Sequence, residues 1–189
     1  NSNGQMLTGW QQVGGKWYYL NPSSGRMHTG WTWDGEAYYF LASDGHWIEV
    51  STQYYDMFTY AQGYSSSTNY LILVDTSGCR VAVYYGSYNN WSPVREFICS
   101  PGKPSTPTVK GQFTVQSKGY VFGRGYSCYY YTQFYGDYLF HSILYYPGTF
   151  RVQDGRLGQH LSHGCIRLAI GNAKWIYDTV PRGSKVVVW

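Results

Sequence analysis

Apolar residues occur along this 189-residue chain in short runs, separated by segments rich in glycine, serine and proline. The run Leu71–Asp75 is followed by Thr76-Ser77-Gly78, a pattern typical of a buried strand that ends in a turn. Similar runs predict further strands at 81–85, 94–99, 112–116, 129–134, 139–145 and 185–189. The chain is therefore predicted to be mainly β, with a sandwich or half-open barrel as its main domain.

One segment, 172–180, has a convincing helical pattern. Asn172 is placed to cap its start and Pro181 to stop it, and one side of it carries Ala173, Ile176 and Val180. The segment 51–62 fits either a second short helix or a wrapping segment. The three prolines in 100–108 exclude that segment from a sheet interior and predict a surface loop.

The N-terminal part of the chain contains an internal repeat. Gly4–Trp10 recurs 21 residues later as Gly25–Trp31, and Gly15–Leu20 is echoed by 35–40. A period near 20 residues is typical of small units stacked in a line. Each unit is expected to be a β-hairpin with a glycine turn. The predicted organisation is a repeat module at 1–47, a connecting segment at 48–68 and the main domain at 69–189.

Composition narrows the function classes. Charged residues make up only 13% of the chain and aromatic residues 20%, including 22 tyrosines and 8 tryptophans. Many rings must therefore be partly exposed, which suits sugars, peptides and quaternary amines. The net charge of +4 comes without a Lys/Arg run, which argues against a nucleic-acid partner. No apolar run reaches the roughly 18 residues of a membrane span. Because the chain begins inside a repeat, we expect a mature or excised fragment without its signal sequence.

The candidate chemistry centres on Ser162–Arg167, which places Cys165 after His163 and Gly164, with His141 upstream. A thiol with an imidazole from elsewhere in the fold is what nucleophilic acyl transfer requires. His141 is expected to hold the thiol as a thiolate and later protonate the leaving amine. The backbone N–H groups of His163, Gly164 and Cys165 are placed to form an oxyanion hole.

Two other chemistries compete for these residues. A zinc site would use His160, His163 and Cys165, with His141 as a fourth ligand, but the spacing around Gly164 is unusual for one ion. Ser100 and Lys103 match the S-x-x-K string of serine acyl enzymes. Pro-Gly inside that string prevents the helix that it requires. We therefore expect no metal and no organic cofactor.

The repeats resemble the choline-binding, or cell-wall-binding, repeats of Gram-positive surface proteins. In that family, rings of successive hairpins form a cage for the trimethylammonium group of choline. The matching positions here are Trp10, Trp17, Met27, Trp31 and Tyr38. The second repeat departs from the pattern at Ala37. Choline or another wall polymer and purely structural ring stacking both remain open.

The main domain resembles the L,D-transpeptidase catalytic domain, the YkuD family, over residues 69–189. The likeness rests on Ser-His-Gly-Cys-Ile-Arg at 162–167, Phe-His-Ser at 140–142 and the Gly-Lys…Thr-Pro-Thr…Gly loop at 102–111. One departure is a longer segment between the histidine and the cysteine, with the excess at 146–155.

The resemblance implies roles for particular residues. Cys165 would be the nucleophile, His141 the general base and the Ser142 carbonyl the group that orients His141. His163 and Gly164 would belong to the oxyanion hole. Arg167 would either bind a substrate carboxylate or brace the catalytic strand. Two further residues are expected to line the cleft, Tyr131 and Tyr145.

The resemblance implies a secreted or wall-bound enzyme of peptidoglycan biosynthesis and cell shape in a Gram-positive bacterium. It would form 3→3 cross-links between stem peptides through a thioester on Cys165, with release of D-Ala, and carbapenems would acylate the same thiol. The alternatives are an L,D-carboxypeptidase and a non-catalytic wall-binding adhesin. Peptidoglycan and a wall polymer such as choline-bearing teichoic acid are the expected partners, with no obligate protein partner evident.

The other three cysteines permit at most one disulfide. A hairpin with 80–85 facing 94–99 would put Cys79 and Cys99 on opposite faces, but this register is weakly determined. The pairs Cys79/Cys99 and Cys99/Cys128 both remain open.

Overall fold

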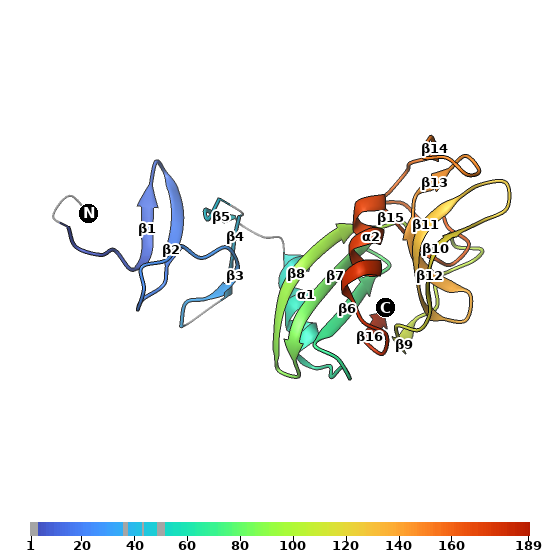
Figure 1. Ribbon diagram of the computed structural model, residues 1–189. Coiled ribbons are helices and arrows are strands. Elements are labelled where there is room, and N and C mark those ends of the chain that lie inside the picture. Colours follow the sequence, from blue (N-terminus) through green and yellow to red (C-terminus); the bar gives the residue numbers. More distant parts are fainter. Residues whose placement is uncertain (1–3, 36–37, 43, 49–51) are drawn as a thin grey trace. The chain divides into compact units, whose positions relative to one another are not determined.

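The protein is described by a computed structural model that covers residues 4–35, 38–42, 44–48 and 52–189, without the side chains of 30, 31, 33, 38, 40, 48 and 52–56. The chain divides into an N-terminal unit, residues 1–59, and a C-terminal unit, residues 60–189 (Figure 1). The division falls within helix α1 (Thr52–Gln62). Neither helix in the described residues is long and apolar enough to cross a membrane.

The N-terminal unit contains the predicted hairpin. Strands β1 (Gly9–Val13) and β2 (Lys16–Leu20) pair antiparallel. Gly14 and Gly15 connect them with φ of 59° and 80°, values that glycine adopts without the steric penalty of a side chain. A second sheet contains three strands, of which the third was not predicted: β3 (Gly30–Trp33), β4 (Tyr38–Leu41) and β5 (Trp47–Ile48).

The larger sheet of the C-terminal unit has the order β8-β7-β6-β16-β9. Its central strand β6 is almost wholly buried, as its apolar sequence predicts. β16 pairs parallel with β6 and antiparallel with β9, which brings the end of the chain into the middle of the sheet. The strands are β6 (Tyr70–Asp75), β7 (Arg80–Ser87), β8 (Asn90–Ile98), β9 (Gly111–Thr114) and β16 (Lys185–Val188).

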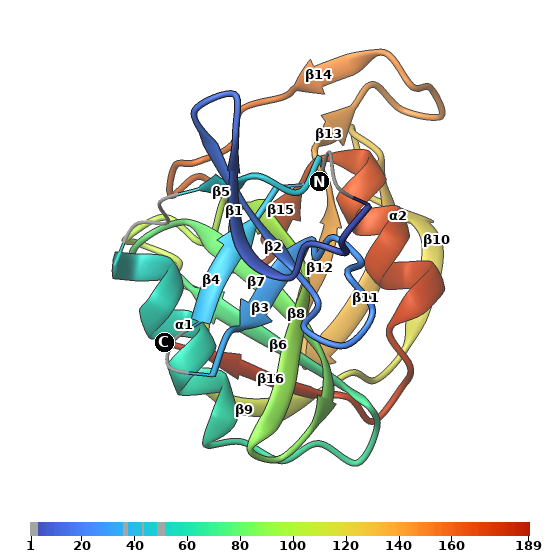
Figure 2. The same ribbon diagram turned by 90° about the vertical axis from the view of Figure 1, so that its left-hand side faces the viewer.

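The second sheet has the order β10-β11-β12-β15 and carries the candidate chemistry. The predicted run 139–145 divides into two strands, and the short hairpin β13–β14 follows β12 directly. This hairpin lies at one end of the C-terminal unit in both views (Figures 1 and 2). The strands are β10 (Lys118–Phe122), β11 (Cys128–Tyr135), β12 (Tyr138–Ser142), β13 (Leu144–Tyr145), β14 (Val152–Asp154) and β15 (Ile166–Leu168).

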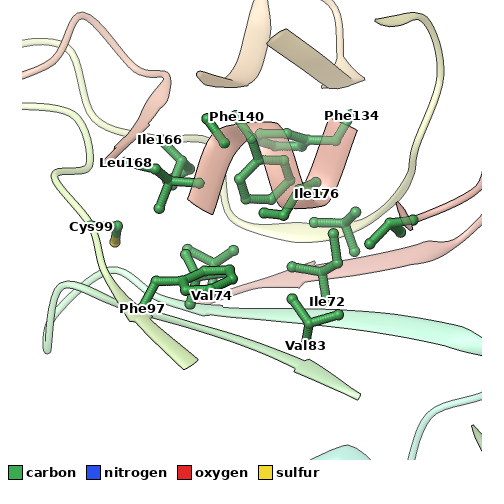
Figure 3. Close-up of a cluster of buried hydrophobic side chains, with 14 of the residues drawn as sticks. Ile72, Val74, Val83, Phe97, Cys99, Phe134, Phe140, Ile166, Leu168 and Ile176 are labelled. Atoms are coloured by element: carbon green, nitrogen blue, oxygen red, sulfur yellow. The ribbon is translucent and has the colours of Figure 1, made fainter. Parts of the chain in front are cut away.

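One hydrophobic core joins the two sheets, which confirms the mainly β, sandwich-like prediction. Ile72, Val74 and Val83 of the larger sheet share a buried cluster with Phe134 and Phe140 of the second sheet (Figure 3). Phe140 is fully buried one residue before His141. Removing its ring would cost about 3–5 kcal/mol, so packing of the core also fixes the position of the histidine.

Helix α2 (Ile170–Thr179) packs on β11 and β12 and contributes Ala173, Ile176 and the adjoining Val180 to the core, as predicted. The predicted cap was wrong. The helix begins two residues earlier, with Ala169 at the cap position and no side-chain cap, and Asn172 lies within the first turn. β15 ends one residue before the helix cap, so the position of this strand determines where the helix starts.

Candidate active site

A cavity of about 290 Å³ in the C-terminal unit brings most of the predicted catalytic residues together. Residues of the second sheet, the β13 strand and the turn before β15 line it. They are Phe122, Tyr126, Cys128, His141, Leu144, Ser162, His163, Cys165 and Arg167.

His141 is positioned by backbone pairing. It lies on β12 opposite Arg167 of the parallel strand β15, so the histidine and the catalytic segment share one register. Its Nδ1 lies 2.6 Å from the carbonyl oxygen of Ser142. A carbonyl only accepts, so Nδ1 carries the proton and Nε2 keeps its lone pair. Burial lowers the pKa of the His141 imidazole to about 4, against the effect of the Ser142 bond. The ring is therefore neutral at pH 7.

Ser142 is itself held on both sides. Its hydroxyl accepts a hydrogen bond from the amide of Tyr129 at 2.8 Å and donates to the carbonyl of Ile143 at 2.7 Å. The first bond ties β12 to β11, so the carbonyl that orients His141 belongs to a fixed peptide.

The turn at 162–165 is built around two small residues. Ser162 Oγ accepts from the amide of Gly164 at 3.0 Å and donates to the carbonyl of Cys165 at 2.6 Å. Gly164 has φ of +121°, and a Cβ there would lie 2.8 Å from the ring of Tyr138. Only glycine fits this turn. Since the Gly164 amide is engaged with Ser162, the amides of His163 and Cys165 are the better candidates for an oxyanion hole.

Cys165 is half-buried, and its thiol donates to the carbonyl of Asp137 at 3.3 Å. Burial raises the pKa of the Cys165 thiol above its ordinary value, which favours a resting thiol rather than the thiolate expected from the sequence. A second thiol, Cys128, also lines the cavity, and burial raises its pKa to about 12.

The loop at 100–108 holds the catalytic segment from outside. Ser100 and Arg167 exchange two backbone hydrogen bonds of 2.8 and 3.0 Å. Thr108 Oγ1 donates to the carbonyl of Gly164 at 2.7 Å. Lys103 Nζ lies 3.4 Å from Nε2 of the exposed His163. The proline-containing loop thus holds the 162–165 turn in place through hydrogen bonds, a role that the sequence alone did not indicate.

Arg167 is braced from the β13–β14 hairpin. Its Nη1 lies 2.9 Å from Asp154 Oδ2, while Asp154 also receives three hydrogen bonds from Arg156, two from the guanidinium and one from the backbone amide. Arg156 and then Arg167 hold the pKa of the Asp154 carboxyl well below its usual range. The Nε of Arg167 is buried without a hydrogen-bond partner. Asp154 was missed from the sequence, although it is the single acidic residue in the enlarged segment 146–155.

Two predicted cleft residues lie elsewhere. Tyr145 is buried against the rings of Tyr129 and Phe150, and Tyr131 packs edge-on against Phe122. The cavity is lined instead by Phe122, which also meets His141 edge-on at 5.2 Å, and by Tyr126. Among the described residues, no group of three His, Cys, Asp or Glu side chains is arranged to hold a metal ion.

A second cavity, of about 340 Å³, lies in the N-terminal unit, and the described residues that line it are all aromatic: Trp10, Trp17, Tyr39 and Trp47. Trp10 and Tyr39 meet edge-on at 4.7 Å, and Trp10 Nε1 donates to Asp34 at 2.9 Å.

The structure brings together two of the five predicted wall-ligand residues, Trp10 and Trp17. Met27 instead lies against Gly45, and the side chains of Trp31 and Tyr38 fall outside the described residues. Sequence reasoning missed Trp47, which had been taken as a domain boundary. It also missed Tyr39, although Tyr39 repeats the position of Tyr19.

Two protein families match this chain, one in each unit. Residues 69–188 match the L,D-transpeptidase catalytic domain (YkuD), and residues 7–50 match the choline-binding repeat. The first match covers more than half of the chain, which therefore belongs to the L,D-transpeptidase family.

Individual relatives support this assignment. The chain is 37% identical over 92 residues to YciB, a proposed L,D-transpeptidase of Bacillus subtilis (strain 168), covering 43% of this chain and 46% of YciB. A Clostridium acetobutylicum ATCC 824 structure, described as a fused Zn-dependent amidase/peptidase/peptidoglycan-binding domain-containing protein, is 43% identical with a TM-score of 0.61, covering 71% of this chain and 59% of that one.

An L,D-transpeptidase from Mycobacterium smegmatis is 27% identical with a TM-score of 0.52, covering 64% of this chain and 58% of that one. This chain thus spans less than two thirds of the length of each of these three relatives.

Proposed function

We propose that this protein is a peptidoglycan L,D-transpeptidase that forms 3→3 cross-links through a thioester on Cys165. The observation that carries the proposal is a single cavity that contains the Cys165 thiol and a neutral His141, whose proton is fixed on Nδ1 by the Ser142 carbonyl. This arrangement places a nucleophile and a base in the lining of one cavity.

The first half-reaction follows from these protonation states. Cys165 Sγ attacks the carbonyl carbon of the third residue of a tetrapeptide stem while its proton passes to His141 Nε2. The amides of His163 and Cys165 stabilise the oxyanion. The tetrahedral intermediate then expels the amine of the terminal D-Ala, which takes the proton from His141. The resting thiol and neutral imidazole mean that proton transfer accompanies attack.

In the second half-reaction, the side-chain amine of another stem attacks the thioester carbonyl. His141 accepts the proton of this amine, and Cys165 leaves as the thiol. The product is the 3→3 cross-link, and the enzyme returns to its starting state. The same thiol would open the strained ring of a carbapenem to give a stable acyl-enzyme.

The test is incubation of the full chain with a disaccharide-tetrapeptide, followed by mass spectrometry of the products. The proposal predicts loss of D-Ala together with cross-linked dimers, and neither product with Cys165→Ala. Shortened monomers without dimers would indicate an L,D-carboxypeptidase. Absence of both products from the intact protein would leave a wall-binding adhesin.

We further propose that the ring-lined cavity binds a quaternary ammonium group such as choline on a Gram-positive wall polymer, which would hold the secreted enzyme near its substrate. Four rings and almost no polar surface suit a cation that needs no hydrogen bonds. Retention of the full chain on a quaternary-amine resin, with elution by free choline, tests this. The proposal would be contradicted if salt alone eluted the chain at the same position as a protein of similar charge that does not bind choline.

A further inference from the structure

Three cysteines have no part in the proposed chemistry, and the structure places two of them, Cys79 and Cys99, side by side as free thiols. In the β7–β8 pairing Arg80 faces Ile98, so the next step outward puts Cys79 directly opposite Cys99. The amide of Cys99 donates to the carbonyl of Cys79 at 2.8 Å. The expectation that these residues lie on opposite faces was therefore wrong, because the strands pair one residue away from the assumed register.

Their side chains share one environment. Cys79 and Cys99 are both buried and belong to the hydrophobic cluster that contains Val81 and Phe97 (Figure 3 shows Cys99 at its edge). The N···O distance of 2.8 Å and standard bond lengths put the two Cα atoms no more than about 6.7 Å apart. That spacing lies within the range of disulfides, roughly 4.4–6.8 Å.

The backbone at Cys79 gives an independent indication. Cys79 has φ of 55°, in the left-handed region that favours glycine, at the end of a turn held by the Asp75 carboxylate. A residue other than Gly, Asn or Asp in this region is uncommon. Its side chain makes contacts that glycine could not make, because Sγ lies 4.0 Å from the carbonyl oxygen of Thr76 and the thiol packs in the buried cluster.

We propose that Cys79 and Cys99 form an intrachain disulfide that joins the start of β7 to the end of β8. The oxidant is a small-molecule disulfide. The thiolate of one cysteine attacks it and releases one small thiol, and the second cysteine then attacks the mixed disulfide and releases the other. The two protein thiols lose two electrons and two protons, and the small disulfide becomes two thiols.

The exchange takes place during folding. Burial raises the pKa of both thiols in the folded protein, so the reduced pair would be unreactive once the strands have closed. Cys128 is a poorer partner, since it lies on β11 in the other sheet and lines the catalytic cavity.

The disulfide would stabilise the end of β8, which is hydrogen-bonded to the catalytic segment. Ser100, the residue after Cys99, exchanges two backbone hydrogen bonds with Arg167, and the carbonyl of Cys99 accepts from Gly158 at 3.0 Å. The catalytic segment is thus hydrogen-bonded to the residues that directly follow β8. A cross-link there would oppose fraying of that attachment without entering the cavity.

The test maps thiols in the full chain. The protein is refolded with reduced and oxidised glutathione, denatured without reductant, alkylated, digested and analysed by mass spectrometry. The proposal predicts one linked peptide pair containing Cys79 and Cys99, lighter by two hydrogens than the separate peptides, with Cys128 and Cys165 alkylated. Alkylation of all four cysteines, or a link from Cys99 to Cys128, would overturn it.

A stability measurement provides the second arm. The oxidised protein should melt about 5–10 °C above the same protein with reductant. Cys128→Ser should keep this difference and Cys99→Ser should lose it. A reductant effect that persists in Cys99→Ser would contradict the assignment, and the mapping in the unsubstituted chain does not depend on either variant folding.

Discussion

The two cavities of this protein are similar in volume, about 290 and 340 Å³, but they are built in opposite ways. In the catalytic cavity His141 and Arg167 are each fixed by a side-chain hydrogen bond shorter than 3 Å. In the cavity of the N-terminal unit four rings present their surfaces, and only Trp10 has a polar anchor in the structure as described. Proton transfer needs atoms at defined positions, whereas binding a soft cation needs only ring faces. Substitutions should therefore affect the first cavity far more than the second.

The largest effect is expected at His141. His141→Gln removes the base while keeping a polar side chain, and kcat/KM for D-Ala release should fall by roughly 10²–10⁴. Steady-state kinetics on the disaccharide-tetrapeptide measures this. His160→Gln is the matched control, since His160 lies outside the catalytic cavity and should remain within about twofold of the unsubstituted protein. Equal losses of kcat/KM in both variants would contradict the assignment of His141 as the general base.

The pH dependence should follow the low pKa of His141. Because its folded-state pKa is about 4, the base stays neutral down to that pH, and kcat/KM should hold its plateau to about pH 5. The same shift affects stability with a definite sign. The unfolded state, with a histidine pKa near 6.5, binds the proton more readily, so the free energy of unfolding should fall as pH drops from about 6.5 to 4. An acidic limb near pH 6.5 in kcat/KM would contradict a buried neutral base.

Gly164 should be a sensitive backbone position in the catalytic turn. Gly164→Ala places a Cβ 2.8 Å from the Tyr138 ring at a φ of +121°. We expect a loss of about 1–3 kcal/mol in the free energy of unfolding and a loss of activity of at least about tenfold. Gly171→Ala is the control, because nothing lies within 4 Å of a Cβ there and helices favour alanine. Urea unfolding should separate the two variants clearly, and equal stability would contradict the described turn.

Asp154→Asn should have a smaller effect on activity. It removes the charge that braces Arg167, and a loss of about tenfold in kcat/KM is expected from a displaced guanidinium. Because the pKa of Asp154 is lowered in the folded protein, its contribution to stability is present above about pH 4 and lost as pH falls further. Asp178→Asn breaks only an exposed pair with Lys174 and should change little. If both variants behave alike, the hairpin does not position Arg167.

The smallest change is expected in the ring-lined cavity. Tyr39→Ala removes one of the four described rings, and affinity for choline should fall by roughly 2–5-fold, corresponding to about 0.5–1 kcal/mol. Calorimetry on the full chain measures it. Turnover of a soluble disaccharide-tetrapeptide should be unchanged. Tyr88→Ala, an exposed tyrosine in the C-terminal unit, is the control and should bind choline normally.

Sequence alone could predict the strands of the C-terminal unit and which residues gather at the site. Buried strands such as Leu71–Asp75 carry their own apolar signal, and a motif with a local turn, such as Ser162–Arg167, needs no long-range information. Three strands were missed: a glycine interrupts β10, and β14 and β15 have only three residues each.

The predictions that failed concerned strand register and contacts between segments that are distant in the sequence. The opposition of Cys79 and Cys99 changes with a one-residue shift of two strands. Asp154 reaches Arg167 only through the fold of a hairpin. The Asn172 cap failed because tertiary placement of α2 overrode a local preference.

The central claim is that Cys165, and not Cys128 in the same cavity, carries the acyl group. The most direct measurement is acid-quenched intact-protein mass spectrometry after mixing the chain with a tetrapeptide donor that offers no acceptor amine, followed by peptide mapping. The account predicts one adduct, equal in mass to the donor acyl group without D-Ala, on Cys165. An adduct on Cys128, or D-Ala release in Cys165→Ala at the rate of the unsubstituted protein, would contradict it.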